Sequence, residues 1–352
     1  MHKILVFTDV HIVAQGQTII GLDPFARFTQ GLAHALTRHP DAARIVLCGD
    51  LTHRAAPEEY ARLREALADC PLPVSLMLGN HDRRAAFLTA FPETTQMDSG
   101  HIQHTADIGA YRLICLDTLD EAAPDLHSGW LCPARLDWLD QRLTEAGPRP
   151  VIVFTHHPPI DTGFAGMDAI GLRNRDELIA RLSAADNVVQ IMSGHIHRTV
   201  QGAAGGIPTA ILKSPCHQMP MSLDAQDTSL SIDEPGAYGL LLLTLTITSL
   251  YAGLIGLLFV LLSVLVITAR FKTNVSIGDG GKELLVRRIR VQANCAEYAP
   301  LGLILLALTE VQGVYATKFK EAVEANSDHT IQLFPYGTLG ESADIMEQAQ
   351  AG

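Results

Sequence analysis

Positive charge is scarce in this sequence of 352 residues. It contains 26 Lys and Arg against 38 Asp and Glu, which gives a formal net charge of −12 at pH 7. A protein that binds a nucleic-acid backbone needs clustered Lys and Arg, so the balance argues against a nucleic-acid polymer as the partner. A small phosphate ester remains compatible, because bound metal ions can supply positive charge locally.

The sequence also lacks a cysteine framework and a secretion signal. Its six cysteines, at positions 48, 70, 115, 132, 216 and 295, form no CxxC pair and no regular spacing. That pattern predicts reduced thiols in a cytosolic compartment. The first seven residues run directly into a predicted strand without a cleavable signal pattern. We therefore expect a cytoplasmic catalytic domain.

Charge is absent altogether from Gly239 to Ala269. A bilayer core needs about 20 apolar residues in a helix, so this run is long enough to cross a membrane. Its first part, 239–244, could instead close the preceding sheet as a strand, which leaves 245–269 for the span. The alternative for the whole run is a buried strand followed by a core helix. We expect membrane association through 245–269.

The pattern of residues 1–244 predicts an α/β domain. Short apolar runs suited to buried strands alternate with amphipathic stretches, several of which open with Pro. The expected strands are Lys3–Thr8, Ala43–Cys48, Val74–Leu78, Tyr111–Leu116, Val151–Thr155 and Asn187–Met192. The expected helices are Pro24–Arg38, Pro57–Ala68, Pro133–Ala146 and Arg175–Ala184.

Five short motifs follow the ends of these strands. They are Asp9-x-His11, Gly49-Asp50, Gly79-Asn80-His81-Asp82, His156 and Gly194-His195-Ile196-His197. Loops at the carboxyl ends of strands form sites in α/β sheets. A carboxylate such as Asp50 can bridge two cations, and imidazoles and a carboxamide oxygen can complete the coordination. The motifs predict a site for two divalent metal ions, and ligation by O and N without thiolate favours Fe, Mn, Zn or Co.

With these motifs, residues 1–244 resemble the calcineurin-like metallophosphoesterases, specifically the class III branch of cyclic-nucleotide phosphodiesterases and glycerophosphodiesterases. The resemblance implies a four-layer α/β/β/α sandwich. It implies one metal held by Asp9, His11 and His197, a second held by Asn80, His156 and His195, and Asp50 as the bridge. By the same resemblance, His81 contacts the phosphoryl or leaving-group oxygen, and Asp82 orients the His81 ring by accepting its other N–H.

The expected reaction is hydrolysis of a small phosphodiester, such as a 3',5'-cyclic nucleotide or a glycerophosphodiester, by attack of a metal-bridging hydroxide. Two other branches do not fit. Asp50 is followed by Leu-Thr-His-Arg rather than by the Asp-Arg-Gly of protein phosphatases, and the tyrosine ligand of purple acid phosphatases is missing. His53 and His217 are candidates for substrate contact, and the alternative for each is a structural role in its loop.

Residues 245–310 resemble a second family, the MAPEG membrane proteins, which are four-helix bundles. Arg290, Asn294 and Glu297 match positions that help to bind glutathione in that family; a polar helix face at the membrane boundary is the interpretation we favour. The family needs four spans, whereas this chain has one and then Ala299–Thr309, which is too short to cross a bilayer. The alternative function is therefore a MAPEG-like membrane protein with a glutathione-related role, in which the front domain is a passenger.

Residues 311–352 resemble the early part of a solute-binding protein of TRAP transporters, through runs such as 319–323 and 331–340. This predicts a short α/β tail without a complete binding cleft. Three partial resemblances predict a chimaera of a metallophosphoesterase domain (1–244), a truncated membrane segment (245–310) and a solute-binding fragment (311–352). Because C-terminal extensions often mediate association in the metallophosphoesterase branch, the sequence leaves a homo-oligomer open.

Overall fold

The computed structural model describes residues 2–243 and 247–296. The predicted solute-binding fragment therefore lies outside the described residues. The chain divides into two compact units after Leu243, and each unit is described by itself.

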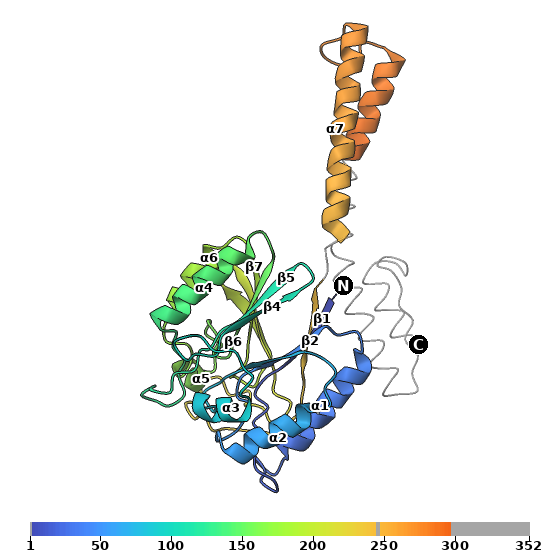
Figure 1. The fold of residues 1–352 in the computed structure, drawn as a ribbon. Helices are drawn as coiled ribbons and strands as arrows, with labels where there is room; N and C mark the ends of the chain where they lie inside the picture. Colours follow the sequence, from blue (N-terminus) through green and yellow to red (C-terminus); the bar gives the residue numbers. More distant parts are fainter. Residues whose placement is uncertain (1, 244–246, 297–352) are drawn as a thin grey trace, which may run out of the picture. The chain divides into compact units, whose positions relative to one another are not determined.

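Two sheets stack face to face in the first unit, with helices on both outer sides (Figure 1). The first sheet has the order β10 (Gly239–Leu243), β1 (His2–Phe7), β2 (Arg44–Cys48) and β3 (Val74–Met77). The second has the order β4 (His104–Ile108), β5 (Tyr111–Cys115), β6 (Val151–Thr155), β7 (Val188–Ser193), β9 (Ile207–Ile211) and β8 (Val200–Ala204). The helices are α1 (Pro24–Arg38), α2 (Pro57–Leu67), α3 (Arg84–Ala90), α4 (Pro133–Ala146), α5 (Ala165–Ala169) and α6 (Arg175–Ser183). The predicted four-layer sandwich is confirmed.

Alternation along the strands builds the layers. Ile4 and Val6 of β1 pack between the two sheets, whereas Leu5 and Phe7 pack against the helices of the first outer layer. A strand buried on both faces needs an unbroken apolar run, which is the pattern that identifies β1 in the sequence. Each fully buried aliphatic or aromatic side chain contributes roughly 1.5–3 kcal/mol, so these layers hold the strand ends in fixed positions.

The strand directions bring the motif loops to one edge. β1, β2 and β3 run parallel to one another, as do β5, β6 and β7. Their carboxyl ends therefore lie at the same edge of each sheet. The run at 239–243 pairs antiparallel with β1 as β10, which confirms the prediction that it closes the sheet.

The second unit contains α7 (Ile247–Thr273) and a helical stretch at 283–296. Within the described residues, one helix, at Ile255–Thr273, is long and apolar enough to cross a membrane. The stretch 283–296 packs against it: Nε2 of Gln292 lies 2.7 Å from Oγ of Ser263, and Nη1 of Arg288 donates to the Leu265 carbonyl at 2.7 Å. The helix is compatible with the predicted membrane segment.

Candidate metal centre and active site

The seven predicted ligands converge where the parallel strands end. Asp9 follows β1, Asp50 follows β2, and Asn80 follows β3. From the second sheet, His156 follows β6 and His195 follows β7. The loop after β1 and the loop after β7 also supply His11 and His197, so the structure brings all seven side chains together.

One group consists of Asp9, His11, Asp50 and His197, whose candidate ligand atoms all lie within 4.8 Å of one another. Nε2 of His197 is 3.3 Å from Oδ1 of Asp9 and 3.0 Å from Nε2 of His11. Nε2 of His11 is 3.5 Å from Oδ2 of Asp50. Two imidazoles and two carboxylates that face one point form a donor set suited to a divalent transition metal.

A second group adjoins it and consists of Asn80, His156 and His195. Oδ1 of Asn80 is 2.9 Å from Nδ1 of His195 and 3.2 Å from Nε2 of His156. Nε2 of His156 is in turn 3.3 Å from Oδ2 of Asp50. One oxygen of Asp50 thus lies beside nitrogens of both groups, which is the position that the predicted bridging role requires.

The two buried carboxylates lack a permanently cationic partner. Among the described residues, the ion pairs of Asp9 and Asp50 involve histidines only, and both side chains are buried. A buried charge without a counter-charge is costly. Nε2 of His195 is also buried without a hydrogen-bond partner among the described residues. The donor set therefore fits two divalent cations.

The histidine rings are oriented by backbone carbonyls. Nδ1 of His156 is 2.9 Å from the carbonyl oxygen of Cys48, and Nδ1 of His197 is 3.1 Å from that of His217. Such a contact places the ring proton on Nδ1 and leaves Nε2 as a donor atom for a metal, as in metal-binding histidines generally. In both residues, Nε2 faces a carboxylate of the cluster.

Burial and the buried carboxylates act in opposite directions on the protonation of the histidines in the cluster. Burial, and then the nearby His81, lower the pKa of His11 well below its usual value, so its imidazole is neutral at pH 7. His156 differs, because the Asp50 carboxylate outweighs the effect of burial and raises the pKa of His156 to about 9. The site thus favours a positive charge next to Asp50.

The backbone of the cluster is unusual. Asp9, His11, Asp50, His195 and His197 all have positive φ, between 45° and 73°. Non-glycine residues rarely adopt this conformation, which costs about 1–3 kcal/mol for each residue and concentrates at functional sites.

Glycine precedes two of these residues because no other side chain fits. Gly49 has φ of +92°, and a Cβ there would meet the His156 ring. A Cβ at Gly194 would meet Oγ1 of Thr8 and Oδ2 of Asp9. The glycines of these two motifs are thus required by close packing.

His81 borders both the cluster and the open space above it. Its ring centroid is 4.6 Å from that of His11, and its backbone N–H donates to Oδ1 of Asp50 at 2.8 Å. Nδ1 of His81 faces the carbonyl oxygen of His53 at 2.8 Å. The predicted hydrogen bond from the His81 ring to Asp82 is therefore wrong. Consecutive side chains point apart here, because the backbone turns at Gly79–Asp82.

Asp82 instead holds the loops that carry the ligands. Its two oxygens accept hydrogen bonds from the backbone N–H groups of Leu51, Thr52 and Gly79 at 3.0–3.2 Å, and from the hydroxyls of Thr52 and Tyr60. Leu51 and Thr52 directly follow Asp50, and Gly79 directly precedes Asn80. Burial, and then Asp50, raise the pKa of Asp82 to about 6.

A cavity of about 380 Å³ opens over the cluster. His53 and His217, the two candidates for substrate contact, both line it. So does His127, which sequence reasoning missed: its Nδ1 is 3.1 Å from Nδ2 of Asn80. No motif surrounds His127 in the sequence, and only the fold brings it to the cavity. The remaining lining comprises Ile19, Ile20, Met167, Ile170, Met219, Thr228, Ser229, Leu230 and Ser231.

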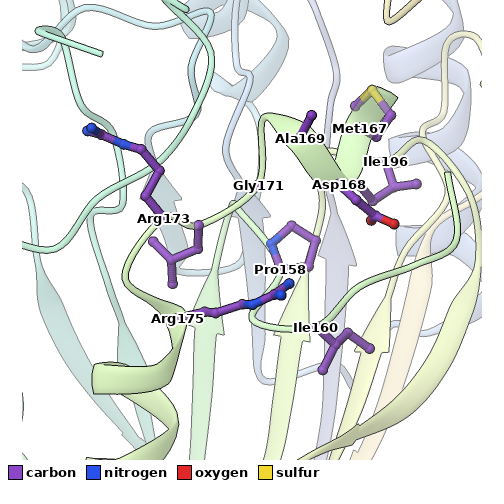
Figure 2. Close-up of a pocket in the computed structure, with 10 residues that line it drawn as sticks. Pro158, Ile160, Met167, Asp168, Ala169, Gly171, Arg173, Arg175 and Ile196 are labelled. Carbon is purple, nitrogen blue, oxygen red and sulfur yellow. The ribbon is translucent and has the colours of Figure 1, made fainter. Parts of the chain in front are cut away.

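A second cavity, of about 200 Å³, lies beside α5 (Figure 2). Met167 lines both cavities. The charged groups of the second cavity already have partners: Arg173 pairs with Asp120, and Arg175 with Asp161. None of the predicted ligands lines this cavity, so it is set apart from the metal-binding groups.

Comparison with known proteins supports the same interpretation. The family model described as calcineurin-like phosphoesterase matches residues 2–199. Over 240 residues, the chain is 41% identical to a Rhodopseudomonas palustris protein named probable cyclic nucleotide phosphodiesterase, covering 67% of this chain and 86% of that protein. It is 32% identical over 222 residues to an Enterobacter lignolyticus protein named glycerophosphodiester phosphodiesterase, covering 60% and 77%. The fold is similar to that of a dimetal phosphatase from Danio rerio, with a TM-score of 0.50 and 15% identity over 61% of this chain and 88% of that one.

Two further matches are to other kinds of protein. Residues 248–321 match the MAPEG family model, as the sequence predicts. A stretch of 46 residues is 83% identical to an ectoine/5-hydroxyectoine-binding periplasmic protein of Ruegeria pomeroyi, covering 13% of this chain and 14% of that protein. The chain thus joins segments similar to three unrelated proteins. Of the positions matched to glutathione binding, Arg290 and Asn294 lie in the helical stretch 283–296, and Glu297 lies outside the described residues.

The front unit therefore combines three independent observations. Its fold is a two-sheet sandwich flanked by helices, its strand ends carry a cluster suited to two metals, and more than half of the chain matches one family model. Enzymes of that family use divalent metals at a dinuclear site. The chain belongs to the calcineurin-like phosphoesterase family.

Proposed function

We propose that the front domain, residues 1–244, is a metal-dependent phosphodiesterase that hydrolyses a small phosphodiester, such as a 3',5'-cyclic nucleotide or a glycerophosphodiester. The observation that carries the proposal is the convergence of two ligand groups on Asp50 at the floor of a cavity. The names of the two relatives, a cyclic nucleotide phosphodiesterase and a glycerophosphodiester phosphodiesterase, support the substrate class.

In this proposal Asp9, His11 and His197 would hold one metal, Asn80, His156 and His195 would hold a second, and Asp50 would serve both. Fe, Mn, Zn or Co suit such mixed oxygen and nitrogen ligands. When bound, two divalent ions would lower the pKa of a water molecule and neutralise the phosphoryl oxygens.

We assign to His81 the transfer of a proton to the leaving group. Nδ1 of His81 faces the His53 carbonyl, so this atom carries the ring hydrogen and Nε2 is left for the substrate. When protonated, Nε2 would donate a hydrogen bond to a phosphoryl oxygen or give its proton to the leaving oxygen. His53 and His217 would contact the ester oxygens from the cavity wall.

The proposal includes a catalytic unit in the cytoplasm that α7 associates with a membrane. The MAPEG match and the apolar span support this association. A need for detergent to keep the full chain in solution would agree with it, and a chain that stays dispersed without detergent or lipid would not.

Hydrolysis of bis(p-nitrophenyl) phosphate by the full chain in detergent tests the function. Turnover with Mn²⁺ that stops on chelation is the expected result. Asp50→Asn and Asn80→Ala should lose bound metal and activity together. His81→Ala should keep its metal and lose turnover by about 10²–10⁴-fold, the usual contribution of an acid–base group. Equal metal loss in all three variants would contradict this division of roles.

A further inference from the structure

The segment 212–238 joins the two sheets across the metal centre, and we call it the strap. It leaves β9 in the second sheet and enters β10 in the first. Its middle part, residues 217–231, supplies one wall of the 380 Å³ cavity, through His217, Met219 and residues 228–231. The strap is thus the one connection between these two strands, and it lies where a substrate would extend beyond its phosphate.

Hydrogen bonds close the strap on itself and fasten its tip. The backbones of Gln218 and Ile232 exchange two hydrogen bonds, of 3.1 and 2.8 Å. Beyond this bridge, the Leu223 carbonyl accepts from the N–H of Ala165 at 2.8 Å. The part of the strap that lines the cavity is therefore fixed by the Gln218–Ile232 bridge at its base and by the Ala165–Leu223 hydrogen bond at its tip.

Glu234 ties the far end of the strap to the loop that carries the metal ligands. Its two carboxylate oxygens accept from Nη1 and Nη2 of Arg198 at 2.7 and 2.8 Å, and from Nζ of Lys213 at 3.1 Å. Arg198 follows His197 and also donates to the carbonyl of Met219. The Glu234 carboxylate thus fixes the end of the strap. It also fixes Arg198, which holds the earlier part of the strap through the Met219 carbonyl.

The side chains that line the cavity favour an uncharged ester group on the substrate over a charged one. Apart from Asp50 at its floor, the lining in the described part of the chain has no acidic side chain, no Lys, no Arg and no aromatic ring other than histidine. A cationic head group such as choline needs carboxylates or aromatic faces, and additional phosphates need Arg or Lys. Aliphatic side chains with a few hydroxyls suit an uncharged group of nucleoside size.

We propose that the strap is the specificity element of the site: residues 217–231 bind the uncharged ester group of the substrate, and Glu234 is the positioning residue that holds them in place. The inference rests on the proposed function and deepens it. It favours cyclic nucleotides over glycerophosphodiesters with charged head groups.

Glu234→Gln, assayed in the full chain loaded with Mn²⁺, tests the proposal. Asp107→Asn is the matched control, because Asp107 also lies between two cationic side chains, Arg112 and Arg149, at 2.7–3.0 Å. Asp107 belongs to β4, at the outer edge of the second sheet, and does not line the cavity. Arg198 itself is unsuitable for substitution, because it adjoins a proposed metal ligand.

Three substrates separate the roles: cyclic AMP, glycerophosphocholine and methyl p-nitrophenyl phosphate, whose two ester groups are both smaller than a nucleoside. The wild type should prefer cyclic AMP to glycerophosphocholine. Glu234→Gln should lower kcat/KM for cyclic AMP about tenfold, mainly through KM, and change kcat/KM for the methyl ester by less than about threefold. A merely structural role would lower both alike. Equal losses on both substrates, or no loss relative to Asp107→Asn, would overturn the proposal.

Hydrogen exchange distinguishes a failure of the strap proposal from a failure of the proposed function. Amides of 219–231 should exchange faster in Glu234→Gln than in the wild type or in Asp107→Asn. If no substrate is hydrolysed, the proposed function fails, and protection of 219–231 by cyclic AMP in the wild type still decides whether the strap binds an uncharged ester group. Unprotected amides would reject it.

Discussion

Replacing Asp82 by asparagine tests whether this carboxylate supports the ligand loops or the ring of His81. Asp82 is fully buried. Oδ2 accepts from the N–H groups of Leu51 and Gly79, and Oδ1 accepts from the N–H and hydroxyl of Thr52 and from the hydroxyl of Tyr60. An amide of the same shape turns one of these acceptors into a donor.

The structure predicts which acceptor the amide replaces. An NH₂ group at the position of Oδ2 would face two N–H groups that cannot accept. At the position of Oδ1 it would face two hydroxyls that can rotate, and only the N–H of Thr52 would lose its partner. A buried N–H without a partner costs about 1–3 kcal/mol. Asp82→Asn should therefore destabilise the front unit by about 2 kcal/mol, and Asp82→Ala, which removes every acceptor, by on the order of 4 kcal/mol or more.

Urea unfolding of the chelated chain measures this cost. Both tryptophans, Trp130 and Trp138, lie in the front unit, so their fluorescence reports on that unit alone. With a slope of about 2–3 kcal/mol per molar urea, a loss of about 2 kcal/mol shifts the midpoint by about 0.7–1 M. His81→Ala, the control, should leave the midpoint unchanged.

An unchanged urea midpoint for Asp82→Asn would refute this reasoning. If Asp82→Asn unfolds at the wild-type midpoint and loses only turnover, Asp82 acts through the His81 ring, and the hydrogen bonds described above contribute nothing to stability. A shifted midpoint together with weaker metal binding would establish that Asp82 holds the loops of Asp50 and Asn80.

Two further predictions concern other parts of the front unit. Burial, and then Arg44, lower the pKa of His104 to about 4, so below about pH 6.5 the unfolded chain binds a proton that the folded chain does not. Stability should therefore fall as pH falls from 6.5 to 4, by up to about 3 kcal/mol from this residue; urea midpoints at pH 7 and 4.5 should differ less in His104→Gln than in the wild type. Gly194→Ala should push aside Asp9 and Thr8 and lower bound metal, measured by atomic absorption, from about two ions to about one per chain; two retained ions would show that the loop can move.

The sequence predicts the buried elements of the fold better than the exposed ones. Pro24–Arg38 and Pro133–Ala146 are helices at their predicted bounds, because Pro fixes the first turn of each. The predicted strands do not include β4, β8 or β9. β4 and β8 are edge strands with several exposed or half-exposed residues, so neither shows the apolar run that marks a strand buried on both faces. β9 lies between β7 and β8, but its exposed Pro208 interrupts the apolar run.

The residues of the candidate site also fall into those that the sequence predicts and those that it does not. The seven ligands could be predicted because each lies in a short motif directly after a strand. His127 and residues 228–231 could not, since they reach the cavity through long loops without a repeated pattern. The contact between His81 and Asp82 that the resemblance implies is wrong, because Asp82 accepts from the backbone N–H groups of Leu51, Thr52 and Gly79 and the His81 ring faces the His53 carbonyl.

The strained backbone of the cluster is held in place by hydrogen bonds from the surrounding protein. Five residues with positive φ, at about 1–3 kcal/mol each, carry strain comparable with the whole stability of a domain, about 5–15 kcal/mol. Such loops persist only where the surrounding hydrogen bonds determine them. Asp82 supplies these bonds around Asp50, and Oγ of Ser214 supplies one to the Asp9 carbonyl at 2.7 Å. These hydrogen bonds from the protein hold the backbone that carries Asp9 and Asp50.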